Sequence, residues 1–138
     1  LATDEKLRLP IIHHPAYSGG FVSPGVSGIA DYLQLGLLPR IFGADMPIFV
    51  SYGGRFTFTA EQCKRISFYI KRPLGLMKAA CPAPGGGVTD ARLNELVALY
   101  GNDTMFLVGG DMFRRGPDIE SNMAYFVERL SELSKNRE

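Results

Sequence analysis

The sequence predicts an α/β fold in which helices cover a parallel β-sheet. Four short apolar runs alternate with four stretches of helical periodicity along the 138 residues. The apolar runs are continuous, whereas a strand with one face in solvent alternates apolar and polar residues. Glycine and proline, with 16 and 9 copies, cluster directly after these runs, where the chain turns toward the next helix.

The apolar runs are the predicted strands, and they cover residues 7–12, 46–50, 77–81 and 104–108. A long loop of glycine, serine and proline follows the first of them over residues 18–28. Continuous apolar strands separated by helices indicate a parallel sheet with right-handed connections.

The helix expected after the first strand covers residues 29–42, where leucine and isoleucine recur at the spacing of one helix face. Asp31 lies in its first turn, and Gly43 stands where a C-terminal stop belongs. Pro39 removes a backbone donor from the interior of this helix, so we expect a bend or an early end near Leu38.

A helix is also expected after each of the other strands. Thr59 is the predicted N-cap of a helix that ends at about Arg72, and Thr89 is the predicted N-cap of the next one. The last helix is expected from about Asp118 to Leu133. Four such strand–loop–helix units fit a doubly wound open sheet, and they also fit half of a (β/α)8 barrel.

Composition and charge limit the function classes. Fifteen basic and fourteen acidic residues leave a net charge of +1, which gives no support for a nucleic-acid footprint. No run of about 18 apolar residues is present, so no membrane partner is expected. Cys63 and Cys81 are too few for a disulfide framework, so a reducing cytoplasm is the expected compartment. The chain begins at Leu1 without methionine, and we expect it to be processed or cut from a longer protein.

The loops after the third and fourth predicted strands are rich in glycine. They contain Gly85, Gly86, Gly87, Gly109 and Gly110. In both candidate folds the loops after the strands share one face, and glycine lets backbone N–H groups approach a phosphate closely. The sequence therefore predicts a phosphate-binding site, and the alternative is that these glycines only form tight turns. Paired carboxylates, a nucleophile elbow, a dinucleotide fingerprint and metal-ligand spacing are not found in the sequence.

Two other side chains are candidates on the same face. His14 follows the first strand and could act as a general base or as a ligand, whereas His13 should point to the other side of the strand. Arg55 follows Gly54 after the second strand and could clamp a phosphate or carboxylate. The alternatives are a histidine that only packs and an arginine that only pairs with Glu61.

Taken in order, the loop motifs resemble the C-terminal part of the RuBisCO large-chain superfamily and, within it, the RuBisCO-like proteins. The motifs are LPIIHHPA at residues 9–16, GAD at 43–45, YGGRF at 52–56, PGGG at 84–87, and GND at 101–103 with GG at 109–110. The resemblance implies that the strands are the fifth to eighth of a TIM barrel. The chain, residues 1–138, would then be a single (β/α)4 half-barrel domain.

The resemblance also implies a chemistry, which is magnesium-assisted enolisation or isomerisation of a sugar-phosphate-like substrate. His14 resembles the active-site histidine of the fifth strand. The glycines that resemble the backbone phosphate cradle are Gly86, Gly87, Gly109 and Gly110.

Three departures from the carboxylase pattern indicate that the chain does not fix carbon dioxide. No lysine lies between Ser51 and Cys63, Pro15 replaces a phosphate-binding arginine, and Gly85 replaces a serine.

The same resemblance implies that parts of the family's active site lie outside this chain. The carbamylated lysine and acidic residues that hold Mg²⁺ belong to the second strand, so no metal site is expected within residues 1–138. The N-terminal domain is also outside, and the chain is expected to be inactive alone. We expect a homodimer that completes the barrel, or a partnership with a missing N-terminal half. The alternative is a non-catalytic module that binds phosphate or is only structural.

Overall fold

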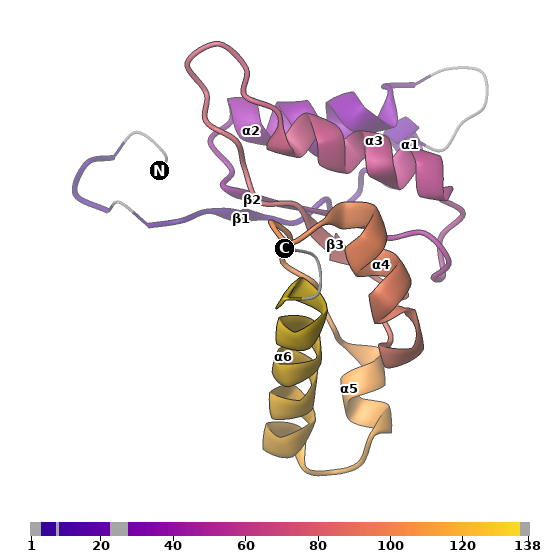
Figure 1. Ribbon diagram of the computed structural model, residues 1–138. Helices are drawn as coiled ribbons and strands as arrows, with labels where there is room; N and C mark the ends of the chain where they lie inside the picture. The colour runs from indigo at the N-terminus through magenta and orange to yellow at the C-terminus, as the bar shows by residue number, and fades with distance from the viewer. Residues whose placement is uncertain (1–3, 8, 23–27, 136–138) are drawn as a thin grey trace.

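A parallel sheet lies at the centre of the molecule (Figure 1). The computed structural model describes residues 4–7, 9–22 and 28–135. The strands lie in the order β1 (Ile12–His13), β2 (Met46–Val50) and β3 (Ala83–Gly85). Both neighbouring pairs are parallel, with Ile12 opposite Met46 and Ile48 opposite Ala83. The predicted α/β fold, with a parallel sheet and helices, is therefore confirmed.

The second predicted strand matches β2, and the other three predictions need correction. In the first, regular pairing is confined to Ile12 and His13 of the described residues; residue 8 of the predicted run lies outside them. The third prediction, residues 77–81, is wrong, because a tight turn between Leu74 and Met77 delays the strand until Ala83.

The fourth predicted strand, residues 104–108, lies beside β3 but is not a regular strand. Met105 and Leu107 donate their N–H groups to the carbonyls of Pro82 and Pro84 at 2.9 and 3.1 Å, and Leu107 forms an isolated parallel bridge. In a parallel strand the N–H and C=O of one residue point to the same neighbour. Pro82 precedes β3 and Pro84 lies within it, and neither has an N–H that could return a hydrogen bond, so pairing with this segment is limited to the bridge between Gly85 and Leu107.

The first predicted helix continues past Pro39. It consists of the π-helix η1 (Tyr32–Leu37) and α2 (Leu38–Ile41). The Leu38 N–H bonds the carbonyl of Leu33, five residues back, and Pro39 lies in the first turn of α2, where a missing donor costs little. The expected early end is therefore replaced by a change of helix type. A short helix, α1 (Gly19–Val22), lies within the predicted loop 18–28, of which residues 23–27 are outside the described residues.

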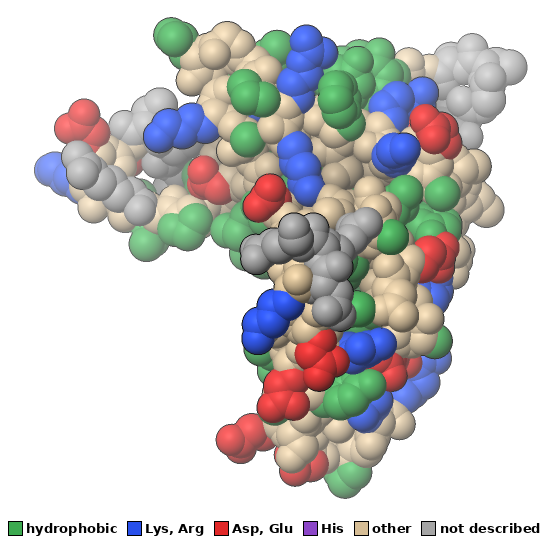
Figure 2. Space-filling view, viewed as in Figure 1, with side chains coloured by type: hydrophobic (Ala, Val, Ile, Leu, Met, Phe, Trp, Pro, Cys, Tyr) green, Lys and Arg blue, Asp and Glu red, His purple; other side chains and the backbone are tan. Residues whose placement is uncertain are grey.

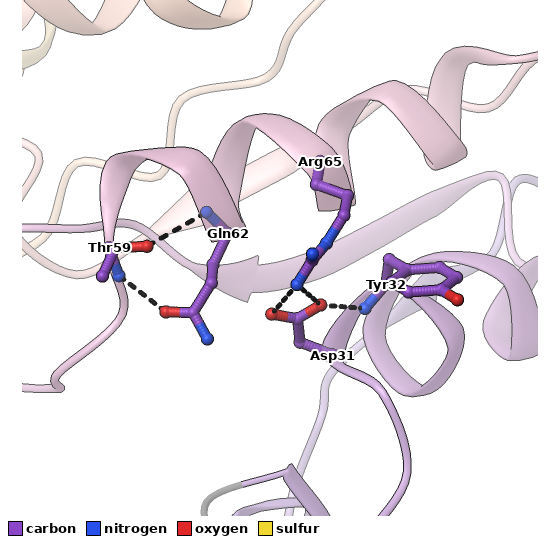
Figure 3. Close-up of polar contacts among 5 residues, drawn as sticks. All are labelled: Asp31, Tyr32, Thr59, Gln62 and Arg65. Carbon is purple, nitrogen blue, oxygen red and sulfur yellow. Dashed lines mark hydrogen bonds and ion pairs between the residues drawn. The ribbon is translucent and has the colours of Figure 1, made fainter.

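Polar caps begin both helices that cover β2 (Figure 3). The Asp31 carboxylate accepts the Tyr32 N–H at 2.6 Å and two contacts from Arg65, at 2.9 and 3.0 Å. Thr59 and Gln62 form a reciprocal capping box at the start of α3 (Ala60–Lys71). The predicted Thr59 cap and the end at Arg72 are confirmed.

The C-terminal helices are η2 (Asp90–Arg92), α4 (Leu93–Tyr100), α5 (Gly110–Arg114) and α6 (Ile119–Lys135). Thr89 is the N-cap residue of η2, as predicted, but its side chain makes no capping bond, and the Asp90 N–H donates to the Asp111 carboxylate at 2.8 Å. The last helix is confirmed, with Asp118 accepting the Ser121 N–H at 3.1 Å. In the described part of the chain, no helix has the length and hydropathy needed to cross a membrane.

The core lies between β2 and the helices η1, α3 and α4, with one contribution from α6. Its fully buried side chains include Leu35, Phe49, Ile66, Ile70, Leu93, Leu96 and Phe126. In Figure 1, α2 and α3 lie above the sheet, whereas α5 and α6 extend below it. Figure 2 shows the resulting L-shaped outline. The sheet is therefore well covered on the α3 side, and the lower arm carries the end of the chain.

Candidate functional site

A cavity of about 960 Å³ lies between the sheet and α6. Its walls come from the segments that follow each strand and from one face of α6. They include His14 after β1, Phe56 and Phe58 after β2, residues 85–89 after β3, residues 106–110, and Met123 and Val127 of α6. His14 and all five glycines of the predicted phosphate loops are therefore brought to one cavity.

The two loops that follow β2 and β3 touch through glycine. Gly87 has φ +72°, and a Cβ there would lie 2.8 Å from the Cα and N of Gly54. Gly86 has φ +78°, but a Cβ there would meet nothing within 4 Å. Gly87 is therefore required by packing as well as by backbone conformation, whereas Gly86 borders open space.

The glycines of the last loop are not explained by packing. A Cβ on Gly109 would meet nothing within 4 Å, and one on Gly110 would meet only the end of the Arg114 side chain at 3.9 Å. Neither has a positive φ. The tight-turn alternative therefore accounts for Gly87 but leaves Gly109 and Gly110 without a structural reason to be glycine.

Arg92 connects the two touching loops, a role that was not predicted from the sequence. Its Nη1 donates to the carbonyls of Tyr52 and Gly87 at 2.8 and 3.0 Å. The guanidinium lies 4.5 Å from the centre of the Tyr52 ring, and Nε pairs with Glu95 at 3.3 Å. An arginine at the start of a helix usually points into solvent, so the sequence contains no signal for this role.

Arg55 and Gly54, the predicted substrate-binding residues, do not line this cavity. Arg55 is exposed and its Cζ lies 5.1 Å from the centre of the Phe56 ring. It makes no ion pair with Glu61 or any other described residue, so the alternative pairing is wrong. Gly54 acts as the backbone against which Gly87 packs.

The two histidines lie on different sides of β1, as the alternation along a strand predicts. His14 is exposed and lines the cavity, and His13 does not. The Nδ1 atom of His13 is buried without a hydrogen-bond partner among the described residues. Burial, followed by the nearby His14, lowers the pKa of His13 below its ordinary value. His13 is therefore a neutral structural side chain, and His14 is the one that can meet a ligand.

The cavity does not fit a divalent cation. Mg²⁺ is held by carboxylate, carbonyl and water oxygens, and no carboxylate is among the lining residues. No group of three or more His, Cys, Asp or Glu in the described residues could hold a metal ion. What the cavity offers is a largely apolar wall, the side chains of His14 and Arg114, and a row of glycine backbone groups.

The amino-acid sequence was compared with protein-family models and with known proteins. No family model matches the chain. Ribulose bisphosphate carboxylase-like protein 1 of Rhodopseudomonas palustris is 35% identical over 131 residues, which are 95% of this chain and 34% of that protein. A 5-methylthioribulose-1-phosphate isomerase of Rhodospirillum rubrum is 36% identical over 107 residues, 78% of this chain and 29% of that protein. A 2,3-diketo-5-methylthiopentyl-1-phosphate enolase of Exiguobacterium sibiricum is 34% identical over 110 residues, 80% of this chain and 28% of that protein.

Solved structures give the same grouping. The RuBisCO-like protein from Rhodopseudomonas palustris matches 90% of this chain and 31% of its own, with a TM-score of 0.74 and 33% identity. The RuBisCO-like protein from Alicyclobacillus acidocaldarius matches 96% of this chain and 33% of its own, with a TM-score of 0.85 and 28% identity. The chain thus spans about a third of the length of the proteins that it matches.

Proposed function

Because this chain belongs to the RuBisCO large-chain superfamily through its match to RuBisCO-like proteins, we propose that it is the phosphate-binding half of an enolase or isomerase. The substrate is a sugar-phosphate-like molecule, and the reaction is not carboxylation. The observation that carries this proposal is the convergence of His14, Gly86, Gly109 and Gly110 on one cavity.

The backbone groups of Gly86, Gly87, Gly109 and Gly110 would hold the phosphate. Gly86, Gly109 and Gly110 border open space, so a ligand can approach their N–H groups as closely as a hydrogen bond requires. His14, exposed at the same cavity, is the candidate general base that would take a proton from carbon.

The rest of the cavity wall suits an apolar substituent at the other end of the substrate. Phe56, Phe58, Met123 and Val127 contribute apolar surface there. The names of two relatives specify substrates with a phosphate at one end and a methylthio group at the other. A phosphate ester with an apolar tail therefore fits both the lining and the relatives.

The chain is expected to need a partner for turnover. In the described residues, β1 lies at one edge of the sheet and the segment 104–108 at the other, and unpaired edges are templates for a further strand. We expect a second copy, or a missing N-terminal half, to complete a (β/α)8 barrel. The Mg²⁺ ligands that this cavity lacks would come from a missing N-terminal half, because a second copy repeats the same residues.

Three measurements on the purified chain test the proposal. Inorganic phosphate is titrated into the parent, a Gly110→Val variant and a Gly20→Val control. A Cβ at Gly20 would meet nothing within 4 Å, and Gly20 does not line the cavity. We expect binding to be lost only in Gly110→Val, with both variants folded by circular dichroism. Unchanged binding in Gly110→Val would remove the glycine cradle.

The second measurement tests whether the chain catalyses proton exchange by itself. The chain is incubated in D₂O with 5-methylthioribulose 1-phosphate and Mg²⁺, and loss of the carbon-bound proton signal is followed by NMR. We expect binding without exchange, because no magnesium ligands line the cavity. Exchange by the chain alone would show that it is a complete enzyme. Light scattering over a concentration series then reports whether two chains associate, and a monomer at all concentrations would contradict the homodimer.

A further inference from the structure

The single turn η2 is hydrogen-bonded to the loops that follow β2 and β3 and to the first turn of α5. Arg92, its last residue, donates to the carbonyl of Tyr52 in the loop after β2 and to that of Gly87 in the loop after β3. Asp90, its first residue, donates its N–H to the carboxylate of Asp111 at 2.8 Å, and Asp111 follows Gly109 and Gly110. One turn therefore contacts both loops of the proposed phosphate site and the loop that supports them.

The contacts at each end of η2 are suited to hold position. The Arg92 side chain is 21% exposed, its guanidinium stacks on the Tyr52 ring, and Nε is held by Glu95. Nη1 alone donates to both carbonyls, while Nε pairs with Glu95 and the guanidinium lies over the Tyr52 ring. A lysine has a single nitrogen on a flexible stem and cannot make all of these contacts at once. The Asp90 carboxylate accepts the Tyr125 hydroxyl at 2.8 Å, which links the turn to α6.

We propose that η2 sets the relative position of the two glycine loops that form the phosphate site, with Arg92 and Asp111 as positioning residues. Neither touches the ligand. Arg92 holds the Gly87 loop against Gly54, and Asp111 holds the Gly109–Gly110 loop against the same turn. This inference rests on the proposed function where it is tested by phosphate affinity, and it is independent of that function where it is tested by amide hydrogen exchange.

The first readout is made without ligand. Amide hydrogen exchange is measured by NMR for the parent and for Arg92→Met, which keeps an apolar stem and removes every donor. We expect faster exchange in the loops after β2 and β3, and also at Gly110, because hydrogen bonds connect all three regions to η2. Changes confined to residues 85–92 would overturn the proposal.

The second readout is the affinity for inorganic phosphate in Arg92→Met, Arg92→Lys and Asp111→Ala. We expect each to bind more weakly by roughly five-fold or more, the lower end of couplings between distinct sites. Arg92→Lys keeps the positive charge, so parent affinity in that variant would show that charge rather than position matters. Arg129→Met is the matched control, because Arg129 also forms an i,i+3 pair, with Glu132 at 3.2 Å, but lies on α6 away from the loops.

Two outcomes are kept distinct. If the parent does not bind phosphate, the proposed function fails, and the exchange data still decide whether η2 positions the loops. If the parent binds and Arg92→Met binds within about two-fold of Arg129→Met, the positioning role of η2 is wrong and the phosphate site stands.

Discussion

Replacement of Gly87 by alanine should destabilise the fold much more than the same replacement at Gly86. Both residues have φ in the left-handed region, +72° and +78°, where a side chain costs about 1–2 kcal/mol. At Gly87 the new Cβ would also lie 2.8 Å from backbone atoms of Gly54, which cannot rotate away. Overpacking of this kind costs about 1–3 kcal/mol more. We therefore expect about 2–5 kcal/mol for Gly87→Ala and about 1–2 kcal/mol for Gly86→Ala.

Urea unfolding followed by circular dichroism measures these differences as changes in the free energy of unfolding. The reciprocal variant, Gly54→Ala, places its Cβ 3.0 Å from the backbone of Gly86 and Gly87 without a positive φ, so it should lose only the packing part. Equal stability of Gly87→Ala and Gly86→Ala would refute the close approach of the two loops. If Gly54→Ala is as stable as the parent while Gly87→Ala is destabilised, backbone conformation alone would account for the destabilisation of Gly87→Ala.

Three further predictions concern residues outside the glycine loops. Burial raises the pKa of the Cys63 thiol to about 11, so iodoacetamide at pH 8 should label only the partly exposed Cys81 in the native chain. The label is located by mass spectrometry, and equal labelling of Cys63 would contradict its burial. The pKa of His13 lies below its ordinary 6.5, so on acidification from pH 7.5 the unfolded chain takes up a proton before the folded chain does, and stability should fall as the pH drops through 6.5. The fall in Tm between pH 7.5 and 5.5 should be smaller in His13→Asn than in the parent. An identical fall would show that another group causes it. Asp31→Ala removes the N-cap of η1 and the ion pair to Arg65. Because Arg65 is half exposed, the free energy of unfolding should fall by about 1–2 kcal/mol, close to the roughly 1 kcal/mol expected for Thr59→Ala at the other cap. A fall above about 4 kcal/mol in urea unfolding would mean that the ion pair behaves as a buried ion pair.

Features that depend on neighbours along the chain could be predicted from the amino-acid sequence. The strand at Met46–Val50 follows from a continuous apolar run, and the helix Ala60–Lys71 from the Thr59–Gln62 capping box with Pro73 beyond its end. The order of strand, loop and helix, and the position of glycine after the strands, are equally local. Because such signals act within a few residues, they survive whatever the rest of the molecule does.

Features that depend on contacts between residues far apart in the sequence could not be predicted in this way. The third strand begins at Ala83 because pairing with β2 begins there, and Pro82 and Pro84 leave residues 104–108 with a single bridge to Gly85 instead of a regular strand. Arg92 reaches Tyr52, 40 residues away, and Gly54 meets Gly87 only when two loops fold against each other. No local pattern records such contacts, since each is fixed by the distance between whole strands rather than by the residues beside it.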